Sequence, residues 1–343
     1  MKRKAHGIGL LSGGLDSALA AKVVQEAGAD VTCLHFFTGF CVTGHNSRIG
    51  RKDRPVGNHA LQVAAEAGIP VELVDISDDY LPMVMRPQHG YGRNMNPCID
   101  CRLFMIDRAR RYMEDVGADF VFTGEVIGQR PMSQMRRTMQ MIERESGLEG
   151  RLLRPLSAKL LEPTVPEREG WIDREKLCAF NGRSRRPQIE LAARFGLTDY
   201  MQPAGGCCFL TDEAYSRKLR DLIEHMGGEP LSMDDVYVLG VGRHFRLSPR
   251  TRIVVGRDEV ENAFLEYYTK THWSARAADC TGPTVVVMGD MDEPGAATVA
   301  AVVARYCKAR EQASVRVELR RNGETRMIDA APLADAVLDE MRI

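Results

Sequence analysis

Residues 7–18 read GIGLLSGGLDSA, and this stretch constrains the fold more than any other part of the chain. A short apolar run is followed by a serine, two glycines and a helical pattern that begins near Asp16. Glycines let a backbone turn sharply and approach a ligand closely, and the free N–H groups at the start of a helix bind anions. The stretch therefore predicts a buried strand, an anion-binding turn and a helix, in that order.

Strand and helix patterns alternate over the first 200 residues. We expect strands at 7–11, 29–37, 69–77 and 118–125, with helices at 16–28, 58–68 and 103–116. This alternation favours an α/β fold, a parallel sheet with helices on both faces. Ligands of such sheets bind beyond the carboxyl ends of the strands, so SGGLDS (12–17), HFFTGF (35–40) and TGEVIGQ (123–129) should converge on one crevice. The stretches 38–58 and 80–96 are expected to be loops over it.

The length of 343 residues is enough for two domains. The pattern changes after about residue 204, and we predict an α/β domain over 1–210 and a smaller α+β domain over 211–343. A net charge of −1 excludes a global attraction to nucleic acid, so any RNA contact must come from a local patch. No apolar run is long enough for a membrane helix and no secretion signal is apparent, so we expect a cytoplasmic protein without a membrane partner.

The glycine loop limits the anion. SGGLDS lacks the Gly-Lys-Ser/Thr ending of a Walker loop and is not G-x-G-x-x-G. It is similar, letter for letter, to the SGGxDS loop of the PP-loop ATP pyrophosphatases. The resemblance implies that ATP is cleaved to AMP and pyrophosphate, with Ser12, Gly13, Gly14 and Ser17 on the phosphates. Asp16 is expected to be catalytic and either to cap helix N–H groups or to face a magnesium ion (Mg2+). The alternative is a tight strand–helix turn capped by serine.

Four of the nine cysteines lie in a pattern suited to sulfur chemistry. NPCIDCR holds Cys98 and Cys101, and AGGCC at 204–208 holds Cys207 and Cys208. Three thiolates suit an open 4Fe-4S cluster on Cys98, Cys101 and Cys207, with Cys208 as the alternative third ligand. A persulfide on Cys101 or Cys207 is a second option, and a structural zinc site with a His or Asp ligand is a third. The remaining thiols are interpreted mainly as structural.

Two further segments resemble the tRNA thiolation enzymes of the PP-loop family, 4-thiouridine synthetase and tRNA 2-thiouridylase. They are TGEVIGQRPMSQ at 123–134 and LLRPLSAK at 152–159. The resemblance implies that a uracil carbonyl oxygen of tRNA is adenylated and then replaced by sulfur from sulfide or a persulfide carrier. We expect the adenine of ATP near His35 and Phe36, and the alternative for His35 is a satisfied histidine at a strand end. Gly124 is expected at the nucleotide, and Gln129 and Ser133 at the nucleotide or the target base.

The C-terminal part resembles the RNA-binding domain of the NFACT proteins in VGRHFRLS and IVVGRDEVEN. It would supply an RNA contact, because the PP-loop begins at residue 12 and the N-terminal RNA-binding extension of 4-thiouridine synthetases is not expected. A basic strip suited to phosphates is predicted here; it comprises Arg243, His244, Arg246, Arg250 and Arg252.

The sequence thus predicts an ATP-dependent tRNA sulfurtransferase that depends on an iron–sulfur cluster. Two alternatives stay open: a PP-loop enzyme that thiolates or amidates a small metabolite, and a non-catalytic RNA-binding iron–sulfur protein. The uridine, the choice of O4 or O2, the sulfur donor and the oligomeric state are left open, with a homodimer as one option.

Overall fold

The computed structural model describes residues 3–50, 59–198, 200, 208–228 and 230–343. The chain divides into two compact units, one of residues 1–44 and 55–207 and one of residues 45–54 and 208–343. The predicted boundary at 210 stays a prediction. None of the helices in the described ranges is both long and apolar enough to cross a membrane.

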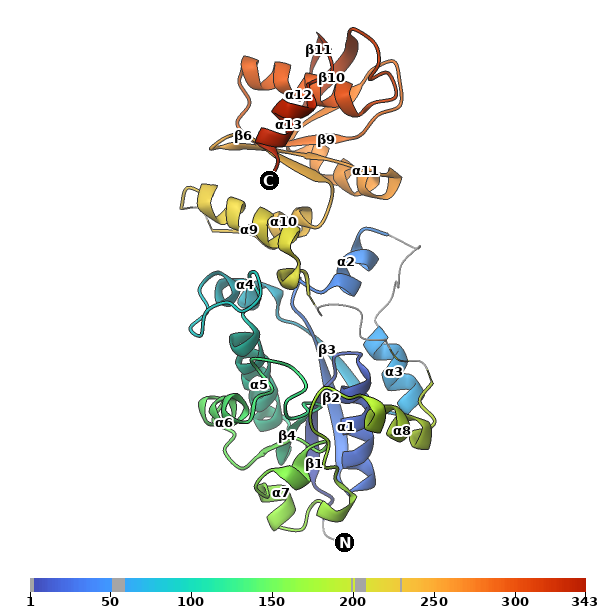
Figure 1. The fold of residues 1–343 in the computed structure, drawn as a ribbon, viewed down its shortest axis with the longest axis vertical. Coiled ribbons are helices and arrows are strands. Elements are labelled where there is room, and N and C mark those ends of the chain that lie inside the picture. Colours follow the sequence, from blue (N-terminus) through green and yellow to red (C-terminus); the bar gives the residue numbers. More distant parts are fainter. Residues whose placement is uncertain (1–2, 51–58, 199, 201–207, 229) are drawn as a thin grey trace. The chain divides into compact units, whose positions relative to one another are not determined.

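A five-stranded parallel sheet forms the centre of the first unit, in the order β3-β2-β1-β4-β5 (Figure 1). Its strands are β1 (His6–Leu10), β2 (Asp30–Phe37), β3 (Val71–Asp75), β4 (Phe120–Thr123) and β5 (Leu152–Leu153). The strands that precede the three predicted crevice segments are therefore neighbours. Their carboxyl ends meet at one edge of the sheet, which is the arrangement that the sequence predicts.

Helices cover both faces of this sheet, which confirms the predicted fold class. On one side lie α1 (Leu15–Glu26), α3 (His59–Ala67) and α8 (Arg186–Phe195), whose apolar residues share one core with the strands. On the other side lie α5 (Cys98–Asp115) and α6 (Arg136–Glu145) (Figure 1). The short elements of this unit are η1 (Ala158–Leu160), α7 (Val165–Arg168) and η2 (Arg174–Lys176).

Glycine at position 9 is required by this packing. A Cβ atom there would lie 2.3 Å from the ring of Phe122 and 2.7 Å from the sulfur of Cys33. Both of those side chains are fully buried, so they could not move away without opening the core. The apolar run that precedes the loop thus contains glycine because β4 brings aromatic rings onto β1.

The expectation of plain loops at 38–58 and 80–96 is wrong in part. Helix α2 (Val42–Arg48) lies in the first stretch, of which residues 51–58 are outside the described part. Helix α4 (Ser77–Met85) extends into the second. It begins where the carboxylate of Asp75 accepts hydrogen bonds from the N–H (2.9 Å) and the hydroxyl (2.6 Å) of Ser77, a start signal that the later Pro82 obscures.

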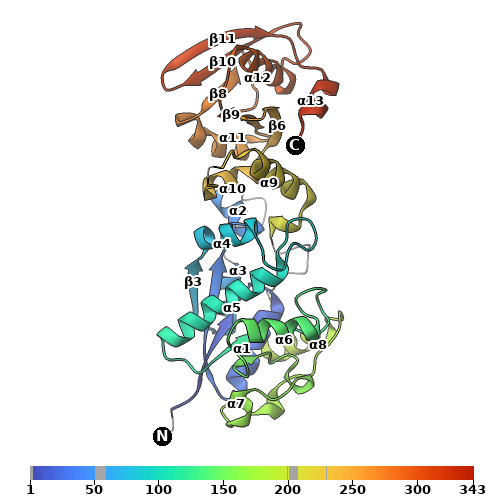
Figure 2. The same cartoon turned by 90° about the vertical axis from the view of Figure 1, so that its left-hand side faces the viewer.

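The second unit contains a six-stranded antiparallel sheet in the order β11-β10-β8-β9-β7-β6 (Figure 2). The strands are β6 (Arg243–Ser248), β7 (Thr251–Val255), β8 (Trp273–Ala277), β9 (Val285–Gly289), β10 (Val315–Arg321) and β11 (Glu324–Ala330). The helical elements are η3 (Phe209–Thr211), α9 (Glu213–His225), α10 (Met233–Leu239), α11 (Glu259–Glu266), η4 (Tyr267–Lys270), α12 (Glu293–Tyr306) and α13 (Asp335–Met341).

The two faces of this sheet are covered to different extents. Helix α12 packs on the face that carries Ile253 and Val255. On the opposite face, Val254 packs with residues of α10 and α11. The strand register continues that second face across β8, β10 and β11, where it presents exposed residues such as Arg276 and Arg320. Half of the second face is therefore buried and half is open.

The predicted basic strip on β6 and β7 is wrong as an exposed surface. His244 is 1% exposed and Arg252 is 3% exposed, because both lie on the half of the face that α9 and α10 cover. Arg246 forms an ion pair with Asp221 of α9, and Arg252 lies 3.6 Å from Asp235 of α10. These side chains hold the sheet to its helices, since a buried cation needs a partner. The two remaining members of the strip, Arg243 and Arg250, are half-buried and exposed.

Candidate nucleotide and sulfur site

The SGGLDS loop forms a closed turn between β1 and α1. Gly13 has a φ of 78°, and a Cβ atom there would lie 3.0 Å from the backbone nitrogen of Ala60. The hydroxyl of Ser17 donates to the carbonyl of Gly14 (2.8 Å) and accepts from the N–H of Ser12 (3.2 Å). The loop thus has a defined shape before any ligand binds, and a side chain at position 13 would be strained.

Asp16 lies in the first turn of α1 and has one satisfied and one unsatisfied oxygen. Its Oδ2 accepts a 2.6 Å hydrogen bond from Nε2 of Gln129, and its buried Oδ1 has no hydrogen-bond partner among the described residues. The N-cap of α1 is Gly14, and no side chain caps the helix, so the expectation that Asp16 caps N–H groups is wrong. A buried carboxylate oxygen without a donor fits a divalent cation, because magnesium prefers oxygen ligands.

Gln188 of α8 supports the contact between Gln129 and Asp16, and no role for Gln188 is predicted from the sequence. Its side chain is 0% exposed, and its Nε2 donates to Oε1 of Gln129 over 2.9 Å. A carboxylate can only accept, so Gln129 must direct its amide NH2 to Asp16 and its oxygen to Gln188. The pair of amides therefore fixes the orientation of the Asp16 carboxylate. Gln188 belongs to no motif and lies 59 residues from Gln129, so the sequence carries no signal for it.

Two more predicted residues border the loop. A Cβ atom on Gly124 would lie 2.6 Å from the backbone of Asp16 and Ser17, so the end of β4 touches the loop directly. The Nδ1 atom of His35 donates to the carbonyl of Leu11 over 2.8 Å, and burial lowers the pKa of His35, which keeps the ring neutral.

The predicted contacts of His35 and Phe36 with adenine stay predictions. Phe36 is 6% exposed and packs in the interior of the first unit.

The TGE segment also joins a buried ion network. Glu125 is 2% exposed and accepts from Thr123 (3.0 Å) and from Nε of Arg154 (3.3 Å). Arg154, from the Arg-Pro-Leu stretch, is 3% exposed and also donates to Glu143 over 2.7 Å. On its other side Glu125 pairs with Arg102, at 3.1 Å. Because Arg102 directly follows Cys101, this network fixes the start of α5.

The two thiols of the Cys-x-x-Cys motif lie in the first turn of α5. Residues three apart on a helix share a face, with Cβ atoms about 5–6 Å apart. The thiol of Cys98 donates to the hydroxyl of Ser133 over 3.4 Å, and Ser133 is 1% exposed. Between the thiols, the buried carboxylate of Asp100 accepts from the N–H groups of Gln88 (2.9 Å) and His89 (3.0 Å). Asp100 thus anchors the preceding loop to the motif.

The structure does not describe the complete predicted ligand set. Cys207 lies outside the described residues, and Cys208 belongs to the second unit. Within the described ranges, no three His, Cys, Asp or Glu side chains are grouped so that they could hold a metal ion. The cluster and the zinc alternative stay predictions.

The eight described cysteines form no disulfide. Among those interpreted as structural, Cys33 is 0% exposed and its burial raises the pKa of the thiol to about 12. Cys307 is also buried, whereas Cys178 and Cys280 are half-buried against the two cores. These positions suit packing, since a free cysteine behaves as a small hydrophobic residue.

Residues 123–134 connect the two halves of the site. Gly124 and Gln129 contact Asp16 of the glycine loop, and Ser133 contacts Cys98. A single twelve-residue segment, TGEVIGQRPMSQ, therefore connects the glycine loop to a thiol. The first unit is thus a parallel α/β domain with the glycine loop directly after its first strand, the arrangement that the resemblance to the PP-loop class implies.

Comparison with known families refines this class. Residues 6–145 match the family described as tRNA methyl transferase HUP domain, and residues 242–342 match the NFACT protein RNA binding domain. These matches confirm the two resemblances seen in the motifs and their order along the chain.

Individual relatives agree with the families. A tRNA-specific 2-thiouridylase MnmA of Salinibacter ruber is 25% identical over 260 residues, which are 70% of this chain and 63% of the relative. A probable tRNA sulfurtransferase of Thermococcus kodakarensis is 26% identical over 43% of this chain and 36% of its own length. The chain thus matches less than two thirds of the length of each.

Among solved structures, a 4-thiouridine synthetase–RNA complex with bound ATP gives a TM-score of 0.33, with 19% identity over 56% of this chain and 52% of that one. A likeness of this strength does not bear on function.

Proposed function

We propose that this protein is an ATP-dependent tRNA sulfurtransferase that thiolates a uridine. The observation that carries the proposal is the segment 123–134, which contacts Asp16 at one end and Cys98 at the other. A tRNA sulfurtransferase needs an activated oxygen and a sulfur nucleophile held close together, because two positioned reactants react far faster than two free ones.

The first step uses the glycine loop. Ser12, Gly13, Gly14 and Ser17 are the residues that would hold the phosphates of ATP, and the free oxygen of Asp16 would face the accompanying magnesium ion. The carbonyl oxygen of uracil attacks the α-phosphate, and pyrophosphate leaves. The oxygen now carries AMP and is a good leaving group. Backbone N–H groups at the start of α1 stabilise the negative charge that develops on the phosphates.

The second step delivers sulfur. In the persulfide route, the outer sulfur on Cys101 or Cys207 attacks the activated carbon, and AMP leaves with the oxygen. A second thiol then attacks the inner sulfur, which releases the thiouridine and leaves a protein disulfide. Two equivalents of an external thiol must reduce that disulfide, and a persulfide carrier must then transfer its outer sulfur to the free cysteine and keep its own thiol. A 4Fe-4S cluster on Cys98, Cys101 and Cys207 would instead supply an iron-bound sulfide as the nucleophile.

The NFACT-type domain supports tRNA as the substrate, since it matches an RNA-binding family. A cytoplasmic location would accord with a tRNA substrate.

Two other functions remain to be separated from this one. An enzyme that thiolates or amidates a small metabolite would release pyrophosphate with that metabolite and without tRNA. A non-catalytic RNA-binding protein would bind no ATP. The complete SGGLDS loop and the unsatisfied Asp16 oxygen argue against that function.

Pyrophosphate release by the purified full chain tests the proposal. We expect release from magnesium ATP to rise strongly when unmodified tRNA and a sulfur donor are added, with one AMP formed for each pyrophosphate. The same tRNA after thiolation should no longer stimulate release. Release that is indifferent to tRNA would contradict the proposal.

A further inference from the structure

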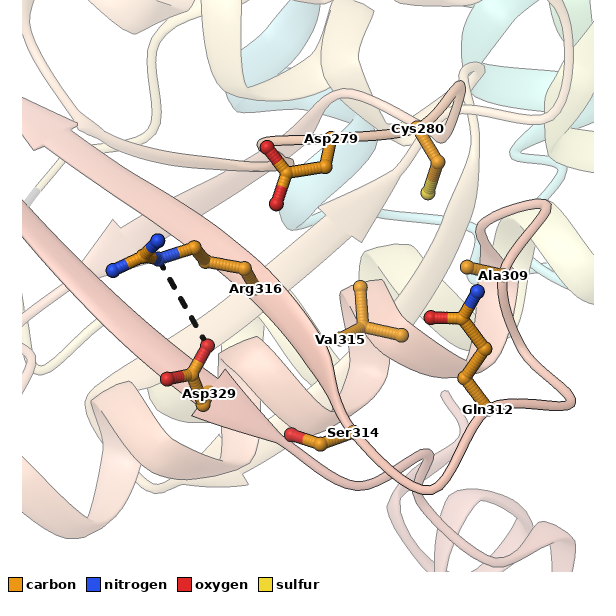
Figure 3. A pocket seen from close by; sticks show the side chains of 8 residues that line it. All are labelled: Asp279, Cys280, Ala309, Gln312, Ser314, Val315, Arg316 and Asp329. Carbon is orange, nitrogen blue, oxygen red and sulfur yellow. Dashed lines mark ion pairs between the residues drawn. The ribbon is translucent and has the colours of Figure 1, made fainter.

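Two hollows lie at the two ends of strand β10. Each has a volume of about 450 Å³. The first is lined at the start of β10 by residues that include Arg316, Asp279 and Asp329 (Figure 3). The second is lined at the end of β10 and by η4, with Lys270, Arg320 and Arg321 as its charged residues. Because the two hollows are equal in volume and opposite in charge, comparing them shows which end of β10 can attract an anion.

The first hollow has no excess of positive charge. Figure 3 shows Arg316 joined to Asp329 by an ion pair, at 4.0 Å, and Asp279 adds a second carboxylate. An anion would be repelled from this end of the strand, because the two carboxylates outnumber the one cation.

The second hollow carries three cations and no carboxylate in its lining. Arg320 is 2.8 Å from Glu318, so its charge is partly compensated. Lys270 and Arg321 are exposed, and neither forms an ion pair with another residue of the described ranges. Cations gathered at one place raise the local positive potential and attract anions, so this end of the strand is suited to phosphate.

A defined backbone completes the second hollow. Of the hydroxyl groups in its wall, those of Thr269 and Ser274 donate to the carbonyls of Glu266 (2.8 Å) and Arg320 (3.4 Å), and Thr325 adds a third. The hairpin between β10 and β11 turns through Asn322 (φ 49°) and Gly323 (φ 86°), both with positive φ, as a tight two-residue turn requires. The cations on this hairpin are therefore carried by a rigid element.

An exposed aromatic ring lies beside the cations. Tyr267, in the same turn as Lys270, is 66% exposed, the highest value among the large hydrophobic side chains of the described residues that are exposed. The ammonium group of Lys270 lies 5.9 Å from the centre of the Tyr267 ring. A ring with one face in solvent next to phosphate-binding cations is the arrangement on which proteins stack an unpaired base.

We propose that Tyr267, Lys270 and Arg321 form a site for an unpaired segment of RNA. The backbone phosphate sits in the hollow at the end of β10, and the adjoining base stacks on Tyr267. This inference rests on the proposed function for its RNA partner and locates the contact away from the β6–β7 strip. A paired duplex fits the site less well, because its bases are stacked on each other and do not reach the tyrosine ring.

Binding of a fluorescent oligouridylate to the full-length protein, measured over a range of salt, tests the site. Lys270→Ala/Arg321→Ala should weaken binding roughly 10-fold and reduce the slope of log affinity against log salt by about 1.4, as for two lost phosphate contacts on a single strand. Tyr267→Ala should weaken binding roughly 10-fold, while Tyr267→Phe keeps the wild-type affinity because the ring remains.

The control removes the cation at the other end of β10. Arg316→Ala should change affinity by less than about twofold, because Arg316 is already paired with Asp329. Circular dichroism and the unfolding midpoint of every variant verify that it is folded. The proposal is overturned if Lys270→Ala/Arg321→Ala binds the oligonucleotide with wild-type affinity and slope, or if a duplex of equal length binds as tightly as the single strand.

Failure of this site and failure of the proposed function give different results. If the wild-type protein thiolates tRNA and the double variant binds RNA unchanged, the site is wrong and the function stands. If the wild-type protein binds RNA through this site but never releases pyrophosphate with tRNA, the function is wrong and the site stands.

Discussion

The carboxyl edge of the first sheet and the β6–β7 hairpin of the second carry motifs that are equally conspicuous in the sequence, but the two regions use their polar residues differently. At the edge of the parallel sheet, Asp16 keeps an unsatisfied buried oxygen. On the hairpin, Arg246 and Arg252 are paired with carboxylates of the helices that cover the sheet. Among the charged groups of the two regions, an atom that is left unsatisfied is therefore a better guide to function than one that is already paired. Nδ1 of the buried His244 on the hairpin also lacks a hydrogen-bond partner among the described residues.

Topology explains this difference. In a parallel sheet all strands end at the same edge, so residues that follow β1, β2 and β4 meet there whatever their side chains are. In an antiparallel sheet successive residues alternate between faces, and a helix can bury either face. The comparison can be tested by variants in both regions, beginning with the largest expected effect.

The largest effect is expected at the network behind the parallel edge. Glu125→Gln removes the buried carboxylate that pairs with both Arg154 and Arg102 and leaves Arg154 with Glu143 alone. Breaking a buried pair from one side costs up to about 3–5 kcal/mol. Urea unfolding should show this loss. Glu190→Gln, which breaks an exposed pair with Arg186 at 2.9 Å, is the control and should cost less than about 1 kcal/mol. Equal losses in the two variants would mean that burial of the network is unimportant.

The next effect concerns catalysis. Asp16→Ala should lower tRNA-stimulated pyrophosphate release by about 100-fold or more, because the oxygen that would face the metal is removed. The fold should survive, since the residue lies at a strand end outside the core. Asp30→Ala removes a carboxylate that pairs with Lys4 on the surface (2.8 Å), and its activity should match that of the wild type. An Asp16→Ala protein with full release would exclude this loop as the ATP site.

A smaller effect is expected at Gln188. Gln188→Leu removes the donor that orients Gln129, so we expect roughly a 10-fold lower rate constant for pyrophosphate release, as for other groups that orient a metal ligand. The KM for magnesium ATP should rise as well, with the unfolding midpoint as a check on the fold. Gln188→Glu can only accept when ionised and should not restore the rate, because Gln129 then lacks a donor. An unaltered rate in both variants would show that the amide pair has no part in positioning Asp16.

The smallest effect distinguishes a core histidine from an RNA contact. Burial, aided by Lys218 and Arg252, holds the pKa of His244 well below 6.5. Below that pH the unfolded chain binds a proton that folded His244 does not, so the free energy of unfolding falls by up to about 1.4 kcal/mol per pH unit. His244→Gln should remove this contribution and leave RNA affinity unchanged. A loss of RNA affinity without a change in the pH profile would mean that His244 belongs to an exposed RNA-binding strip.

Much of the first domain could be predicted because its signals are local. The apolar run at 7–11 and the loop after it appear as β1 and the closed turn within one residue of the predicted limits. The partners of that loop are not local. Gln188 acts through Gln129 across 59 residues, and Arg154 reaches Glu125 across 29, so no window of sequence contains both members.

The exposed surface of the second domain is harder to predict from the sequence for a related reason. Arg252 is one of a run of exposed-looking cations in sequence, but β7 lies between β9 and β6 and both of its faces are covered. Which half of the sheet face stays open depends on where α9 and α10 pack, and helical patterns alone do not specify it. Conversely, Lys270 and Arg321 come together only through the pairing of β8 with β10.

The central claim is that the segment 123–134 joins ATP activation to a thiol for the thiolation of tRNA. Mass spectrometry of nucleosides from tRNA tests it most directly, in cells that carry the gene, lack it, or carry Asp16→Ala, Cys98→Ala or the paired control Cys178→Ala. The account predicts that one thiolated uridine disappears without the gene, stays absent with Asp16→Ala and with Cys98→Ala, and returns with the wild type and with Cys178→Ala. An unchanged set of thiolated nucleosides in cells without the gene would contradict it.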